Sequence, residues 1–177
     1  DYIHFAPPCM ARSRLNGASK RNFDFIQEEY TPVTDLGRLA DECVRISLEI
    51  IRIATAMNPD LSYTIENPRY KSFLQLPGIK DLIRKGNVNY LNLNDYDDEF
   101  SQKPSAWVNN IDNWVSNEVT NTPNKRSNMF GLKNKKSRYT YPTSLCSQVR
   151  RAVEMEMNGR LEEARFASIA ELPHGRL

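Results

Sequence analysis

The chain has 177 residues, of which 40% are hydrophobic and 26% are charged. This length suits one domain with a core of its own, and the composition excludes a protein that is disordered over most of its length. No run approaches the roughly 18 apolar residues that a transmembrane helix needs, so we expect no membrane partner. The net charge of +2, from 24 basic and 22 acidic residues, does not by itself indicate a polyanionic partner.

The cysteines point to a reducing environment. The three cysteines, Cys9, Cys43 and Cys146, match neither a secreted disulfide framework nor a zinc knuckle, which favours an intracellular compartment. Cys43 and Cys146 fall on apolar helical stripes, so we expect both in the core. The chain starts with Asp1 and an apolar run without a secretory signal, which indicates an internal piece of a longer protein.

The first elements are a short strand and a basic loop. Residues 2–6 form a β-prone run, which Pro7 and Pro8 end because proline cannot donate to a strand ladder. Residues 10–22 are small, polar and basic, with no acidic side chain, and predict an exposed mobile loop.

The clearest element is an amphipathic helix between an N-cap at Thr34 or Asp35 and a stop at residues 58–59. Its apolar residues are spaced alternately three and four apart: Leu36, Leu39, Cys43, Ile46, Ile50, Ile53 and Met57. We expect this stripe to pack against a sheet. A coiled coil is the weaker alternative, because the stripe spans only three heptads.

The elements that follow predict an α/β fold. Residues 61–65 and 88–93 have strand character, and residues 70–85 between them form a helix with a break at Pro77. A further strand is expected at residues 106–111. The order strand, helix, strand, helix, strand is typical of right-handed crossovers on a parallel sheet.

An acidic turn and a basic stretch follow. The acids Asp95, Asp97, Asp98 and Glu99 lack the glycine and spacing of an EF-hand loop, which favours a solvated turn over a Ca²⁺ site. Residues 119–153 contain eight basic side chains and no acid. Their first half has turn composition, and Pro142 then opens a helix whose stripe is Leu145, Val149, Val153 and Met157. We therefore divide the chain into an α/β lobe (1–114), a basic loop segment (115–140) and a helical segment (141–177).

One pair of motifs carries chemistry. Cys9 follows the first strand, and Glu66-Asn67-Pro68 follows the next strand. Open α/β sheets place their sites at the carboxyl ends of such strands. A thiol and a carboxylate at one sheet edge suit covalent addition to an electron-poor ring. Without the second motif, Cys9 would be an inert cysteine and Glu66 an exposed turn carboxylate. His4 has no metal-ligating neighbours in sequence and is expected in the core or a pocket.

These motifs resemble those of the C5-cytosine DNA methyltransferases. Pro7-Pro8-Cys9 is similar to the nucleophile motif of this family, and Glu66-Asn67-Pro68 to its glutamate-asparagine motif. Two further stretches resemble the subgroup found in phages and mobile elements. They are Gln102-Lys103-Pro104-Ser105, followed by Trp107 and Asn109, and the helix start at residues 141–146. The resemblance covers about residues 1–155, as the later part of the family's catalytic domain.

The resemblance implies that residues 1–114 are a catalytic lobe with part of a Rossmann-like methyltransferase sheet, and that residues 115–140 are a short target-reading segment. It also implies a role for each residue of the motifs. Cys9 would add to C6 of cytosine, Glu66 would stabilise protonated N3, and Asn67 would support the pocket. C5 would then take a methyl group from S-adenosylmethionine. The loop at residues 12–21 would close over a flipped nucleotide. The residues implied to contact nucleic acid are Arg12, Arg14, Lys103, Lys133, Lys135 and Lys136. The residues implied to contact the cofactor are Pro7 and Pro8.

Two functions remain open. The glycine-rich cofactor motif and the ribose-binding acid of the family do not occur in this chain. S-adenosylmethionine would therefore need an N-terminal lobe or a companion chain. The first function is methylation of cytosine in DNA, with RNA as the alternative substrate. The second is a degenerate methyltransferase-like subunit that binds nucleic acid or has a structural role in a larger assembly.

Overall fold

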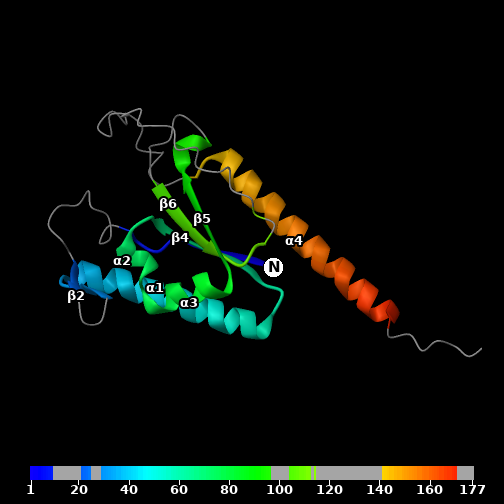
Figure 1. The fold of residues 1–177 in the computed structure, drawn as a ribbon, viewed down its shortest axis with the longest axis horizontal. Coiled ribbons are helices and arrows are strands. Elements are labelled where there is room, and N and C mark those ends of the chain that lie inside the picture. The colour runs from blue at the N-terminus through cyan, green and yellow to red at the C-terminus, as the bar shows by residue number, and fades with distance from the viewer. Residues whose placement is uncertain (10–20, 25–28, 97–103, 113, 115–140, 171–177) are drawn as a thin grey trace, which may run out of the picture.

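A computed structural model describes residues 1–9, 21–24, 29–96, 104–112, 114 and 141–170 (Figure 1). The elements in chain order are β1 (Tyr2–Phe5), β2 (Arg21–Asp24), β3 (Glu29–Pro32), α1 (Asp35–Met57), β4 (Ser62–Pro68), α2 (Lys71–Leu74), α3 (Pro77–Lys85), β5 (Asn87–Asn92), the 3-10 helix η2 (Leu93–Asp95), β6 (Pro104–Asn109) and α4 (Thr143–Ala170). Helices α1–α3 lie on one side of the central sheet and α4 on the other (Figure 1). The predicted mixture of helices and strands is confirmed.

The central sheet has the strand order β1-β4-β6-β5. β1 and β4 are parallel, whereas β6 is antiparallel to both of its neighbours. The three strands of the predicted crossover unit, β1, β4 and β5, run in the same direction. β6 lies between β4 and β5 and is antiparallel to both, so the sheet is mixed and not parallel throughout. An antiparallel partner needs no crossover helix, so the short connection after β5 suffices to bring the chain back beside it.

The separate two-stranded sheet of β2 and β3 also departs from the prediction. β2 and β3 form an antiparallel pair, with Arg21 opposite Pro32. The sequence places Arg21 and Asn22 in a loop because the preceding residues are basic and polar. Strand pairing with β3 overrides this local composition. Residues 10–20 of the predicted loop, the acidic residues after Tyr96 and the segment 115–140 lie outside the described residues.

β4 is one of the two inner strands of the sheet, and every residue from Ser62 to Pro68 is buried. It runs three residues beyond the predicted end because Glu66, Asn67 and Pro68 pair with β6. At its start, the carboxamide of Asn110 accepts from the Tyr63 N–H at 2.7 Å and donates to the Leu61 carbonyl at 2.9 Å. A side chain thus continues the ladder where β6 ends.

The core beneath α1–α3 combines residues of these three helices with residues of β4 and β6. Its buried residues are Val44, Ile65, Phe73, Ile79 and Val108. Helix α1 begins at the predicted cap, where Thr34 Oγ1 accepts from the Gly37 N–H at 3.1 Å. Helices α1 and α3 approach closely at Gly78, where an added Cβ would lie 2.6 Å from Leu48 Cδ1.

The apolar stripe of α1 does not face the sheet. The buried residues of this helix are mostly small: Gly37, Ala40, Val44, Ser47 and Ile51. Leu39, Ile46, Ile50, Ile53 and Met57 are instead 40–83% exposed. The expected packing of this stripe against the sheet is therefore wrong. Small side chains let the helix backbone come close to the strands, and the larger ones are left on another face.

The core beneath α4 joins the far face of the sheet to this helix. Trp107, Ile111 and Trp114 contact the α4 residues Leu145, Val149, Ala152 and Val153. The predicted stripe of α4 is confirmed over these residues, whereas Met157 at its far end is 38% exposed. Cys146 is exposed and Cys43 is half-buried, so neither is the core residue that its sequence position predicts.

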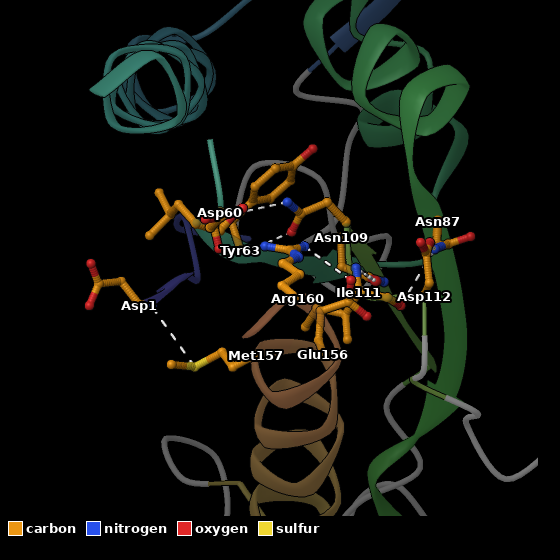
Figure 2. A network of polar contacts seen from close by, with 12 residues as sticks. Asp1, Asp60, Tyr63, Asn87, Asn109, Ile111, Asp112, Glu156, Met157 and Arg160 are labelled. Atoms are coloured by element: carbon orange, nitrogen blue, oxygen red, sulfur yellow. Dashed lines mark hydrogen bonds and ion pairs between the residues drawn. The ribbon is translucent and has the colours of Figure 1, made fainter. Parts of the chain in front are cut away.

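Polar contacts fasten the outer half of α4 to the start of the sheet (Figure 2). Arg160 donates to the Asp60 carbonyl and pairs with Glu156 at 3.0 Å. The amino group of Asp1 lies 3.9 Å from the Met157 sulfur. Within the part of the chain that the structure describes, no helix combines the length and apolarity needed to cross a bilayer.

Candidate active site

The two sequence motifs meet at one edge of the sheet. β1 and β4 are parallel neighbours, with Phe5 opposite Ile65, so both strands end at the same side. Just beyond, Asn67 Nδ2 donates to the Pro7 carbonyl at 3.0 Å. The backbone pairing of β1 with β4 ends at Phe5, and proline has no N–H with which to continue it. The side chain of Asn67 makes the next bond between the two segments. Cys9 is half-buried two residues further along the chain.

Glu66 is a buried carboxylate with oriented oxygens. Only 3% of the surface of Glu66 is exposed. Oε1 accepts from Ser105 Oγ at 2.7 Å, and Oε2 accepts from the Tyr141 hydroxyl at 3.2 Å. These donors come from β6 and from the residues before α4. Two hydroxyl donors offset part of the cost of burying the negative charge and hold the carboxylate in one orientation.

Tyr141 connects Glu66 to the region of Cys9. Burial raises the pKa of Tyr141 strongly, and the charge of Glu66 and its hydrogen bond to the phenol raise it further. A thiolate at Cys9 acts in the same direction. The tyrosine therefore stays protonated near neutral pH and remains a donor to Glu66. Tyr141 is therefore within electrostatic range of both Cys9 and Glu66.

His4 extends this network along β1. Its Nδ1 lies 2.7 Å from Thr64 Oγ1, its Nε2 lies 3.4 Å from the Tyr141 hydroxyl, and its ring stacks on Trp107 at 5.0 Å. Burial lowers the pKa of His4, and the charge of Glu66 opposes this only in part. The expectation that His4 is a core or pocket residue is confirmed.

A pocket of about 430 Å³ adjoins this network between β1, β6 and α4. Tyr2, His4, Trp107 and Tyr141 line one side, and Leu145 and Val149 line the other. The lining is mainly aromatic and aliphatic. Such a surface binds a flat ring or an apolar side chain better than a phosphate.

Other predicted site residues are placed differently. Pro7 is buried and Pro8 is exposed. The expected basic contacts Arg12, Arg14, Lys103, Lys133, Lys135 and Lys136 lie outside the described residues. The sequence did not predict roles for Ser105 and Tyr141, although both fall in stretches that resemble the family. Their contacts to Glu66 span 39 and 75 residues, so no local periodicity indicates them.

The part of the chain that the structure describes contains no glycine-rich turn between a strand and a helix. The described glycines are Gly37, Gly78, Gly86 and Gly159, which lie within helices or at the end of α3. None of them lies in a strand-to-helix turn of the kind that brings backbone N–H groups to a cofactor. No three described His, Cys, Asp or Glu side chains come together as metal ligands.

Comparison with protein-family models, with curated proteins and with solved structures finds no match to this chain. A function for the chain is therefore inferred from the geometry of the site and from the resemblance of its motifs.

Proposed function

We propose that this chain is the catalytic lobe of a DNA (cytosine-5)-methyltransferase-like protein. One observation carries the proposal: the 3.0 Å bond from Asn67 to the Pro7 carbonyl ties the nucleophile motif to the glutamate-asparagine motif at one edge of parallel strands. In this proposal the sheet is part of a Rossmann-like methyltransferase sheet. The buried, doubly hydrogen-bonded Glu66 is the acidic partner of Cys9.

The proposed chemistry is reversible covalent addition. The Cys9 thiolate forms a bond to C6 of a flipped cytosine, N3 carries a proton, and the electron pair of the C5–C6 double bond makes C5 nucleophilic. Glu66 stabilises the positive charge that develops at N3. C5 then takes up an electrophile, which is a proton or deuteron from the solvent when no methyl donor is present. Loss of the original proton from C5, cleavage of the sulfur–C6 bond and release of the N3 proton restore the ring.

The methyl donor of the proposed reaction is S-adenosylmethionine. The described residues do not form its cradle, so we assign the donor to an assembly with a companion lobe and assign no step through it to this chain. Cys9, Glu66, Asn67, Ser105 and Tyr141 serve addition to the base. The six basic residues named above are proposed to contact DNA, or RNA in the alternative.

The second candidate is a degenerate subunit that binds nucleic acid or has a structural role. The observation that favours it is the position of the described glycines, none of which lies in a strand-to-helix turn. A subunit of this kind would keep the fold and the basic surface without covalent chemistry at Cys9. The two candidates therefore differ in a single measurable step, which is addition to C6.

The test is exchange of the cytosine C5 hydrogen in deuterated water without any cofactor. Addition to C6 makes C5 accept a deuteron from the solvent, and reversal leaves deuterium in the base. We expect deuterated cytosine in a DNA duplex after incubation with the chain, measured by mass spectrometry of the nucleosides. Cys9→Ser should abolish the exchange, and Glu66→Gln should slow it by about 10²-fold or more.

Cys43→Ser is the matched control, since Cys43 and Cys9 are both half-buried. It should leave the exchange unchanged. DNA binding is followed in parallel by fluorescence anisotropy. Binding without exchange would overturn the enzymatic proposal in favour of the degenerate subunit. Absence of both would overturn the enzyme and the nucleic-acid-binding subunit, which leaves the structural role.

A further inference from the structure

A continuous series of polar contacts leads from the protein surface to the buried carboxylate of Glu66. The Tyr2 hydroxyl lies 2.6 Å from Thr64 Oγ1, which lies 2.7 Å from His4 Nδ1. Across the imidazole, Nε2 lies 3.4 Å from the Tyr141 hydroxyl, and that hydroxyl donates to Glu66 Oε2 at 3.2 Å. Tyr2 is 39% exposed, whereas Glu66 is almost fully covered. The series therefore connects a buried acid to a side chain that reaches solvent.

The hydrogens of these contacts all point toward Glu66. Tyr141 has one hydroxyl hydrogen and gives it to Glu66, so its oxygen is the acceptor for His4 Nε2. A neutral imidazole carries a single N–H, which is then on Nε2 and leaves Nδ1 to accept from Thr64. Thr64 in turn accepts from Tyr2. Each group can therefore pass one proton inward as it receives another from behind.

His4 is the member of the series that can receive a proton on one nitrogen and release one from the other. Its ring stacks on Trp107 with centroids 5.0 Å apart, which holds the two nitrogens toward Thr64 and Tyr141. Burial lowers the pKa of His4 and the charge of Glu66 opposes this only in part, so the ring is neutral near neutral pH. The titratable and charged groups around it are Tyr2 of β1, Glu66 of β4, Tyr141 before α4, and Cys146, Arg150 and Glu154 of α4.

We propose that Tyr141, His4, Thr64 and Tyr2 form a relay that carries a proton between Glu66 and the solvent. In the inward direction, Tyr141 gives its hydroxyl proton to Glu66 Oε2 and takes the Nε2 proton of His4. His4 Nδ1 takes the proton of Thr64, which takes that of Tyr2, and Tyr2 takes one from a hydronium ion and leaves water. The net change is one proton added to Glu66 and one exchange of tautomer in His4.

The two tyrosines take part without becoming phenolates. Burial raises the pKa of Tyr2 and, more strongly, that of Tyr141. Each therefore releases a proton only as it receives another. Two alternative paths are less suitable. The Ser105 hydroxyl also donates to Glu66, but Ser105 is fully buried. The pocket beside the relay is lined mainly by apolar groups, which offer few partners to ordered water.

The use of the relay rests on the proposed function. In that reaction N3 of cytosine gains a proton when sulfur adds to C6 and loses it when the ring is restored. Glu66 gives this proton to N3 and is reprotonated through the relay. When N3 releases the proton, it leaves by the same path. One inward and one outward passage per cycle return His4 to its first tautomer.

The first test needs no substrate. The chain contains two histidines, His4 and His174, so nitrogen-15 NMR of histidine-labelled protein separates their rings, and His4→Gln assigns them. We expect His4 in the Nε2–H form at neutral pH. The Nδ1–H form would overturn the relay, because His4 would then donate to Thr64 and the donors would no longer all face Glu66.

A matched pair of charge removals tests the link to Glu66 in the same spectra. Glu66→Gln should lower the pKa of His4 further, because the charge that opposes the effect of burial is lost. Glu154→Gln removes an equal charge at the pocket wall, where Glu154 pairs with Arg150, and should have the smaller effect. An equal or larger effect of Glu154→Gln would overturn the proposed link. Circular dichroism confirms that each variant is folded.

The second test is chemical rescue of the C5 exchange described above. His4→Ala removes the middle of the relay and should slow exchange at least about tenfold. Added 4-methylimidazole should restore it, since the vacated space adjoins a pocket of about 430 Å³. The isomer 1-methylimidazole is the same size but has no N–H when neutral, so it cannot pass a proton between its nitrogens and should not restore exchange. Rescue by both compounds, or by neither, would overturn the relay.

The outcomes separate the relay from the proposed function. If the intact chain gives no C5 exchange, the proposed function fails and the two NMR results alone decide the relay. If His4→Ala exchanges as fast as the intact chain, the relay is overturned and the proposed function stands.

Discussion

Helices α1 and α4 carry similar sequence patterns but have opposite relations to the sheet. In α4 the apolar stripe is buried, with Leu145 fully covered and Val149 and Val153 less than a tenth exposed. In α1 the stripe of large side chains is exposed, and a second face of small residues contacts the sheet. An amphipathic pattern therefore predicts that a face will be covered. It does not identify the partner that covers it.

The difference has a physical reason in the size of the side chains. Gly37, Ala40 and Ser47 let α1 lie close to the strands, and Gly78 lets α3 lie close to α1. Helix α4 instead packs large residues against Trp107 and Trp114. Close approach of helices and sheets needs small residues at the contact. The largest side chains of α1 are thereby left exposed.

The largest difference between the two helices is expected when one residue of each stripe is truncated. Leu145→Ala should lower the free energy of unfolding by about 2–5 kcal/mol, because it opens a cavity in a closed core. Ile50→Ala should lower it by about 1 kcal/mol or less, because its side chain is 40% exposed in the isolated chain. Urea denaturation measures both. Equal losses would mean that the α1 stripe is also core.

A second substitution pair compares the two faces of α1 itself. Ala40→Leu enlarges a buried contact with the sheet and should cost about 1–3 kcal/mol of stability. Leu39→Ala on the exposed stripe should change stability by about 0.5 kcal/mol or less. The same denaturation experiment decides the result. If Leu39→Ala proved the more destabilising, the assignment of the two faces would be reversed.

The smallest expected effect concerns pH on the α4 side of the sheet. Burial lowers the pKa of His4 below its ordinary value of 6.5, so the unfolded chain binds the proton more readily than the folded one. The stability from neutral His4 is present above pH 6.5 and is lost as pH falls below it. We expect unfolding free energy measured between pH 7.5 and 5 to fall less in His4→Gln. Identical pH profiles would contradict this.

The candidate site shows the same division between local and long-range information. The position of Cys9 just after β1 follows from sequence, because the effect of proline is local. Glu66 is predicted just beyond the second strand but lies inside β4, because it pairs with β6. The parallel pairing of these strands confirms that their ends share one edge. The roles of Ser105 and Tyr141 could not be predicted, since both reach Glu66 across the sheet and from the other helical layer.

Sequence alone predicts that β1 ends before Pro7, that Thr34 caps α1, and that α4 begins after Pro142. These follow from backbone chemistry within a few residues. Only the tertiary structure decided that β6 is antiparallel, that small residues of α1 face the sheet, and that Tyr141 binds Glu66. Each of these depends on which surfaces meet. That choice is made by the size, shape and hydrogen-bonding groups of residues far apart in the chain.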